Sequence, residues 1–341
     1  MKLERFEGCW TAMVTPFSRK GEVDYEGLEE NVQFLIENGS NLVPTGTTGE
    51  SPTLDWREHD RVITKTAKLA KGKGFVIAGT GSNSTSEAMR GSKHAVEVGA
   101  QGVLLVDCYY NGPSSLEMRT QYYEVIAKAF RKTFVVPYVI PGRTGTKLEV
   151  EDLAILHRKY KNVRSVKEAT GDLRRMAKTR ALCGEDFDIL SGDDDKTFEM
   201  MTLSDIHASG VISVMSNIFP GPIGEMVKAI KNGNMERANG LKDILDPLFK
   251  VVTVNTIESY EGFNVPCKFR NPLAIKTMMK GLGLPSGPCR PPLGKMMPKG
   301  VEIVQNALKE VYGKDQEVFR PLQEFYKINV EERLSNDRYW K

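Results

Sequence analysis

The feature that most constrains the fold of this chain is a regular alternation of short apolar runs with amphipathic stretches. Each run is typical of a buried strand, and in each following stretch the apolar residues recur with the period of a helix. The predicted strands cover residues 9–17, 41–46, 75–81, 102–107, 134–140, 163–169, 187–192 and 210–217. The predicted helices after them cover residues 25–38, 55–71, 85–98, 116–130, 150–160, 173–183, 198–207 and 223–232.

This alternation predicts an α/β fold with a parallel sheet. Eight strand–helix units in about 230 residues favour closure into a (β/α)8 barrel, the TIM barrel. An open, doubly wound sheet is the alternative, but it usually carries a glycine-rich dinucleotide fingerprint after its first strand, where this chain has Thr15-Pro16-Phe17. We therefore predict a barrel that carries the active site over residues 1–232. A helical region with an extended charged tail would follow over residues 233–341.

Composition and charge exclude several classes of function. The net charge of +3 comes from interspersed residues of both signs, and no basic stripe suggests a nucleic-acid partner. The five cysteines show no CxxC spacing and the four histidines no HExxH pair, so we predict reduced thiols and no bound metal. No apolar segment suits a signal peptide or approaches the ~18 residues that span a bilayer, so we expect a cytoplasmic protein without membrane contact.

The predicted sixth strand contains a lysine in an unusual place. In the stretch Ser165–Gly171, alternation puts Ser165, Lys167 and Ala169 on one face of the strand and Val166 and Glu168 on the other. Lys167 either extends outward to water or points into a cavity, where loss of hydration favours the neutral amine. A neutral amine attacks carbonyl groups, which is the basis of Schiff-base catalysis.

Further polar motifs follow other predicted strands. They are the turn Gly46–Glu50 after the second strand, Tyr109-Tyr110-Asn111 after the fourth, Tyr138 with Pro141–Gly145 at the fifth, and Gly192-Asp193-Asp194 after the seventh. Barrel enzymes build their active sites from the carboxyl ends of the strands, so these motifs would surround Lys167. An amine that condenses with a ketone, hydroxyl groups that transfer protons and a guanidinium that binds a carboxylate form a coherent set.

Four of these motifs together resemble a known family. GTTGES at 46–51, YYN at 109–111, YxxPxRTG at 138–145 and VKEATG at 166–171 are similar to the dihydrodipicolinate synthase family. That family belongs to the class I pyruvate-aldolase superfamily, which includes N-acetylneuraminate lyase. The resemblance runs from about residue 8 to residue 227 and continues weakly through residues 282–293. Arg143-Thr144-Gly145 favours the synthases over the sugar-acid lyases. Residues 259–270 and the tail beyond about residue 314 have no counterpart in it.

The resemblance implies a role for each matching residue. Lys167 would form an imine with pyruvate, and Tyr138, Thr47 and Tyr110 would form a relay of hydroxyl groups that moves protons. The further substrate-binding residues would be Thr48 for the pyruvate carboxylate, Arg143 for the carboxylate of aspartate 4-semialdehyde, and Gly192 and the Ile212 carbonyl at the imine site.

The resemblance also implies regulation and assembly. A lysine-binding regulatory site would consist of Ser51, Trp56, His59, Asn83, Glu87 and Tyr109. The family tyrosine that matches Tyr110 reaches into a neighbouring subunit, which implies a homo-oligomer built as a dimer of dimers.

The predicted function is thus a lyase-type synthase that joins pyruvate to aspartate 4-semialdehyde and forms 4-hydroxy-tetrahydrodipicolinate in the diaminopimelate route to lysine. One alternative is a pyruvate-dependent aldolase that acts on a sugar-derived 2-oxo acid. Another is a non-catalytic barrel that binds a ligand.

Overall fold

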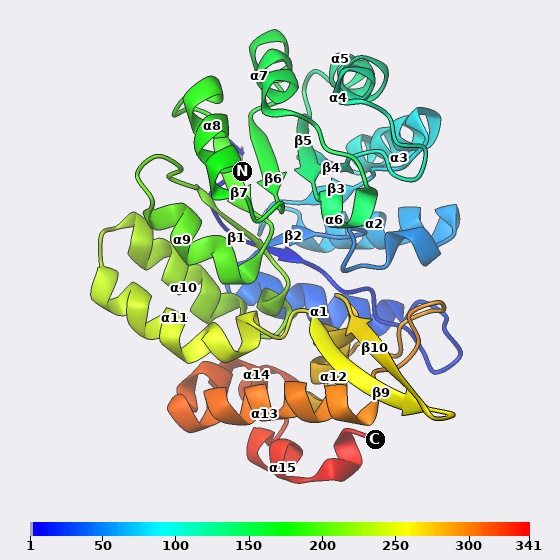
Figure 1. The fold of residues 1–341 in the computed structure, drawn as a ribbon, viewed down its shortest axis with the longest axis vertical. Coiled ribbons are helices and arrows are strands. Elements are labelled where there is room, and N and C mark those ends of the chain that lie inside the picture. The colour runs from blue at the N-terminus through cyan, green and yellow to red at the C-terminus, as the bar shows by residue number, and fades with distance from the viewer. Residues whose placement is uncertain (1–2) are drawn as a thin grey trace.

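Eight parallel strands form a barrel at the centre of the structure, a computed structural model that describes residues 3–341 (Figure 1). The strands are β1 (Gly8–Ala12), β2 (Asn41–Val43), β3 (Ile77–Gly79), β4 (Gly102–Val106), β5 (Phe134–Val139), β6 (Ser165–Glu168), β7 (Asp188–Ser191) and β8 (Gly210–Ser213). Their order is β2-β1-β8-β7-β6-β5-β4-β3. The remaining seam is closed by backbone bonds from Leu42 to Phe75 and from Gly79 to Pro44, each 2.9 Å. The predicted TIM barrel is confirmed.

Helices surround the barrel, as Figure 1 shows. They are α1 (Tyr25–Glu37), α2 (Trp56–Ala70), α3 (Thr85–Glu97), α4 (Ser115–Met118), α5 (Glu124–Ala129), α7 (Val150–Lys159), α8 (Leu173–Cys183), α9 (Thr197–Thr202) and α10 (Pro220–Lys231). The short helix α6 (Pro141–Thr144) lies in the loop after β5. None of the helices within residues 3–341 is long and apolar enough to cross a membrane.

Two apolar layers hold the barrel together. Side chains such as Trp10, Val43, Leu104 and Ile212 fill its interior, and a larger cluster packs between strands and helices. Alternating residues of each strand pack into the barrel interior and against the helices. Both faces of a strand are therefore apolar, which explains the continuous apolar runs in the sequence. Most strands are shorter than predicted, because their last residues leave the sheet and enter the loops. Pro44, placed in a strand by the prediction, follows β2, where it need not donate a ladder hydrogen bond.

The region after α10 contains helices and an unpredicted hairpin. The helices are α11 (Met235–Phe249), α12 (Leu273–Leu282), α13 (Pro298–Lys314), α14 (Arg320–Tyr326) and α15 (Val330–Ser335). The antiparallel strands β9 (Val254–Tyr260) and β10 (Phe263–Phe269) interrupt them (Figure 1). The hairpin includes most of residues 259–270, for which the sequence motifs offered no counterpart. Residues 233–341 are therefore not helical throughout.

The last 26 residues also differ from the predicted extended tail. They fold into α14, α15 and short turns, and Leu322, Val330 and Trp340 are buried. The Tyr326 hydroxyl donates to Asn31 Oδ1 at 3.0 Å, and the rings of Phe325 and Phe34 lie 5.4 Å apart. Aromatic side chains between the charges therefore dock the tail against α1.

Candidate active site

Lys167 points into a cavity at the carboxyl end of the barrel. It occupies the third position of β6, is only 4% exposed, and is paired in register with Tyr138 of β5. Its Nζ atom lies 4.2 Å from the centre of the Tyr138 ring. Of the two orientations that the sequence left open, Lys167 has the inward one, and the structure brings Lys167 and Tyr138 together.

The neighbouring residue Glu168 fixes this orientation from the other side of β6. Its carboxylate accepts from Arg175 Nε of α8 at 3.1 Å and from the Thr170 backbone N–H at 3.2 Å. Arg175 also donates to the Leu148 carbonyl at 2.6 Å. Burial raises the pKa of Glu168, and Arg175 opposes this effect. Because a strand alternates its faces, anchoring Glu168 among the helices holds Lys167 toward the interior.

Lys167 shares a cavity of about 270 Å³ with Thr48 and Gly192. Asn271, which sequence reasoning missed, also lines this cavity and donates from Nδ2 to Thr48 Oγ1 at 2.9 Å. The buried Asn271 Oδ1 has no partner among the residues that the structure describes, and it is free to accept from a ligand. An Asn-Pro pair signals only a turn, so the sequence did not reveal this role. Ile212 is fully buried among the side chains inside the barrel.

The two aspartates after β7 have different environments. Asp194 is buried and accepts from the backbone N–H groups of Val214 and Met215 at 2.9 and 3.2 Å and from the Ser213 hydroxyl. It therefore holds the end of β8. Asp193 lines the Lys167 cavity instead. Burial raises the pKa of Asp193 to about 6, with Asp195 acting in the same direction and Lys167 opposing.

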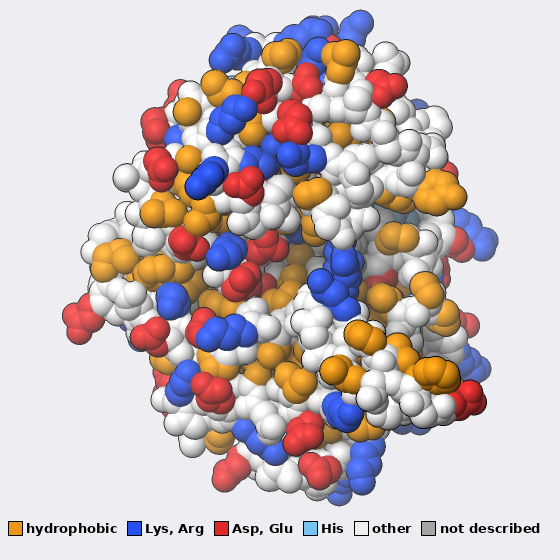
Figure 2. Space-filling view, viewed as in Figure 1, with side chains coloured by type: hydrophobic (Ala, Val, Ile, Leu, Met, Phe, Trp, Pro, Cys, Tyr) orange, Lys and Arg blue, Asp and Glu red, His pale blue; other side chains and the backbone are white. Residues whose placement is uncertain are grey.

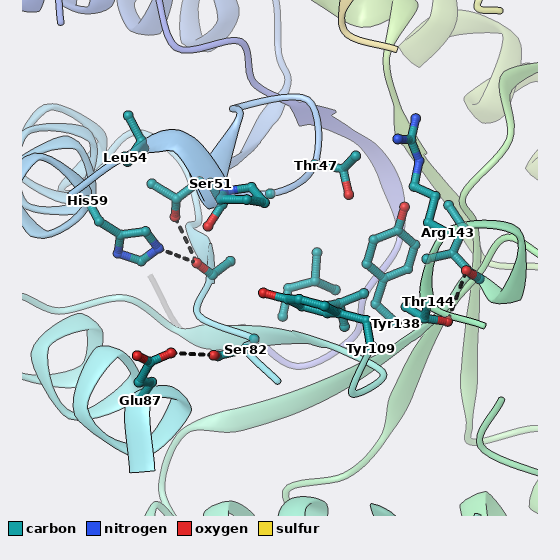
Figure 3. A pocket seen from close by; sticks show the side chains of 18 of the residues that line it. Thr47, Ser51, Leu54, His59, Ser82, Glu87, Tyr109, Tyr138, Arg143 and Thr144 are labelled. Atoms are coloured by element: carbon teal, nitrogen blue, oxygen red, sulfur yellow. Dashed lines mark hydrogen bonds between the residues drawn. The ribbon is translucent and has the colours of Figure 1, made fainter. Parts of the chain in front are cut away.

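A second cavity, of about 470 Å³, adjoins the first. Tyr138, Ile140 and Arg143 line both, so these residues form the boundary between them. In Figure 3 the hydroxyl groups of Thr47 and Tyr138 and the Arg143 guanidinium lie on one side of the second cavity. Thr47 and Tyr138 thus line the same cavity.

Most of the predicted regulatory residues line the second cavity. They are Ser51, Trp56, His59, Glu87 and Tyr109, whereas Asn83 is exposed and outside the lining set. Figure 3 shows Ser51, His59 and Glu87 on the side away from Arg143, and Glu87 accepts from the Ser82 hydroxyl at 2.6 Å.

His59 is a buried acceptor in this second cavity. Its Nε2 atom lies 3.0 Å from the Gly79 carbonyl and donates to it, while Nδ1 has no partner within residues 3–341. Burial lowers the pKa of His59 to about 4, so the ring is neutral near pH 7. The free Nδ1 lone pair can then accept from a ligand that carries N–H donors.

Tyr110 is not brought to the cavities in this chain. Its side chain is 91% exposed, and its backbone adopts a left-handed conformation with φ of +73°. Such a conformation is uncommon for a residue with a bulky side chain.

Arg143 lies at the mouth of both cavities. It donates from Nη2 to the Asn271 carbonyl at 2.9 Å. Desolvation lowers the pKa of Arg143, and the positive charge of Arg270 lowers it further. Tyr138 and Asp193 oppose this decrease. The guanidinium keeps further N–H donors for a carboxylate, the group that its planar fork binds best.

A buried ion pair holds the turn that carries Thr47 and Thr48. Lys276 of α12 lies 2.6 Å from Glu50 Oε1 and donates to the Thr15 carbonyl at 2.9 Å. The second Glu50 oxygen accepts from the Arg290 backbone N–H at 2.8 Å. Sequence reasoning missed both Glu50 and Lys276, because 226 positions separate them and only the fold makes them neighbours.

The chain is similar to known proteins over most of its length. Residues 5–311 match the model of the dihydrodipicolinate synthetase family. A 4-hydroxy-tetrahydrodipicolinate synthase from Methanococcus maripaludis is 40% identical over 306 residues, which cover 89% of this chain and 98% of the relative.

Two solved structures are also similar. A dihydrodipicolinate synthase from Aquifex aeolicus has a TM-score of 0.81 at 37% identity and covers 89% of this chain and 98% of its own. The enzyme from Cyanidioschyzon merolae, solved with lysine bound, has a TM-score of 0.81 at 33% identity and covers 90% and 98%.

Proposed function

This chain belongs to the dihydrodipicolinate synthetase family and is a lyase-type synthase, and from this premise we propose that it condenses pyruvate with aspartate 4-semialdehyde through an imine on Lys167. The observation that carries the proposal is the buried amine of Lys167 beside Tyr138, in a cavity whose mouth holds Arg143. The product would be 4-hydroxy-tetrahydrodipicolinate, and no cofactor is needed because the lysine itself forms the covalent intermediate.

The first half-reaction uses the inner cavity. The Lys167 amine attacks the keto carbon of pyruvate and forms a carbinolamine, which loses water to give the imine. Thr48 binds the pyruvate carboxylate through its hydroxyl and backbone N–H, and Asn271 holds that hydroxyl in place. Tyr138 and Thr47 transfer the protons that the loss of water and the formation of the enamine require.

The second half-reaction joins the two substrates. Arg143 binds the carboxylate of the semialdehyde, and the enamine carbon attacks the aldehyde to form the new C–C bond. The amine of the acceptor then attacks the imine carbon, which closes the ring and releases the free Lys167 amine.

We also propose an arrangement of subunits and a regulatory site. The exposed Tyr110 completes the hydroxyl relay of a neighbouring subunit, so that the working unit is a homodimer or a dimer of dimers. Free lysine binds in the second cavity, where Glu87 offers a carboxylate to its ammonium groups and His59 offers a neutral acceptor.

Reduction of the enzyme with borohydride in the presence of pyruvate tests the function. We expect a stable adduct of one reduced pyruvate per chain on the peptide that contains Lys167, and initial rates with aspartate 4-semialdehyde that fall when lysine is added. An adduct on another residue would refute the proposed site. Turnover of hydroxylated sugar-type aldehydes in preference to the semialdehyde would favour the alternative aldolase.

Replacing Tyr138 with phenylalanine should lower kcat by about 10²- to 10⁴-fold, the range for loss of a positioned proton-transfer group. The ring remains to pack in the inner cluster, so the melting temperature should change little. Tyr312→Phe, in the half-buried layer of α13, is the matched control and should retain full activity. Wild-type turnover in Tyr138→Phe would show that another group transfers the protons.

A further inference from the structure

The hairpin β9–β10 extends from the barrel mouth beside the candidate active site (Figure 1). At its base, Val254 and Phe269 are paired and pack into the apolar cluster. At its tip, Tyr260 and Phe263 are paired and are 71% and 73% exposed. The chain enters the hairpin from α11 and leaves it directly into Arg270 and Asn271, so the hairpin base sets where these two residues lie.

The base of this hairpin forms one wall of the Lys167 cavity. Lys268 and Arg270 line the cavity together with Asn271. Two hydrogen bonds cross between this wall and the loop after β5. Arg270 Nη1 donates to the Gly142 carbonyl at 2.7 Å, and Arg143 Nη2 donates to the Asn271 carbonyl at 2.9 Å. Each arginine therefore donates to the backbone carbonyl of a residue next to the other arginine, and both lie at the mouth of the cavity.

The charges at this mouth are unbalanced. Lys167, Arg143, Lys268 and Arg270 all line the cavity, and among the described residues Asp193 is the one acidic side chain that does. Within residues 3–341, none of Arg143, Lys268 and Arg270 has a carboxylate oxygen at ion-pair distance. Figure 2 shows a hollow near the middle of this face, with both basic and acidic side chains around it. Neighbouring cations repel one another unless an anion lies between them.

We propose that the hairpin base is part of the acceptor site and that Arg270 is a specificity-determining residue that selects aldehydes with an anionic group. Arg270 acts with Arg143, which it anchors through Gly142, and Lys268 adds positive charge at the rim. This inference rests on the proposed function, and it adds to Arg143 two residues, Lys268 and Arg270, that the sequence motifs did not include.

The positive charge at the mouth also predicts which aldehyde acceptors bind poorly. A neutral aldehyde, hydroxylated or not, leaves the cations uncompensated and displaces their water without replacing its hydrogen bonds. An aldehyde with a carboxylate at its other end takes charge-assisted hydrogen bonds from the guanidinium groups, and its reactive carbon then faces Lys167. The cluster thus selects against the sugar-derived acceptors of the alternative aldolase.

The test compares Arg270→Gln with the matched control Arg131→Gln, which removes the same charge from an exposed position after α5. We expect Arg270→Gln to raise KM for aspartate 4-semialdehyde by roughly 10- to 100-fold, the effect of losing a hydrogen bond to a charged group. The KM for pyruvate and the borohydride-trapped adduct on Lys167 should stay at wild-type values. Arg270→Lys should recover part of the loss, and Lys268→Gln should give a smaller loss of the same kind.

Succinate is a dianion about as long as aspartate 4-semialdehyde and has no aldehyde, so it is an unreactive probe of the cavity wall formed by the hairpin base. It should compete with the semialdehyde in the wild-type enzyme more strongly than neutral succinamide, and Arg270→Gln should abolish that difference. An unchanged KM for the semialdehyde in Arg270→Gln would overturn the inference while the trapped adduct still supports the imine. An equal rise in both KM values would also overturn it, because Arg270 would then act only on the shape of the site. Absence of any adduct in the wild type would instead refute the proposed function.

Discussion

Replacing Lys167 with alanine is expected to lower turnover by about 10⁴-fold or more and to abolish the borohydride-trapped adduct with pyruvate, because the covalent nucleophile is lost. Within residues 3–341, no other buried lysine lines the cavity. Lys268 lines the same cavity but is exposed on the hairpin, and Lys276 is committed to Glu50. Methylamine added to the Lys167→Ala protein should restore little activity, since a free amine lacks the position that β6 gives.

Lys161→Ala is the matched control, because it removes an exposed lysine just before the same strand. It should trap pyruvate and turn over like the wild type. Lys167→Arg is a second variant, which keeps the positive charge and most of the volume but cannot form the imine. Substantial turnover by Lys167→Ala or Lys167→Arg would mean that the condensation does not proceed through this residue.

The barrel could be predicted from the sequence because its signal is local and repeated. Each strand and helix leaves its own period in the chain, and the number of units then selects the closed sheet. Strand ends were overestimated where apolar residues continue into the loops, as Met13 and Val14 do after Ala12. The hairpin was missed because its exposed strands carry no buried run. Its tip presents Tyr260 and Phe263 to water, and only Val254 is well buried at its base.

The sequence predicted those site residues that belong to motifs at the ends of strands. Lys167, Tyr138, Thr47 and Arg143 come from such motifs, and the structure brings them to two adjoining cavities. Asn271 and Arg270 reach the site from a part of the chain more than 100 positions away from Lys167, where the sequence shows only a turn. Their partners are carbonyl groups and a threonine, and contacts of this kind leave no pattern in the sequence.

The second large effect concerns the buried ion pair between Glu50 and Lys276. Both side chains are almost completely removed from water, and they join the turn that carries Thr47 and Thr48 to α12. Replacing Lys276 with methionine should lower the free energy of unfolding by roughly 3–5 kcal/mol, because the Glu50 carboxylate stays buried without its cation. The turn should also loosen, which would raise KM for pyruvate through Thr48.

A double-mutant cycle separates the ion pair from the loss of packing. Glu50→Gln alone leaves a buried ammonium group and should destabilise the protein by a similar amount, whereas Glu50→Gln combined with Lys276→Met removes both charges. We expect the double variant to be more stable than either single one, since an unpaired buried charge costs more than the pair itself contributes. Lys178→Met, which breaks an exposed pair with Glu151, is the control and should cost less than about 1 kcal/mol. Strictly additive losses in urea denaturation would show that the two groups act separately, and the turn would then owe its position to the backbone contacts of Glu50 alone.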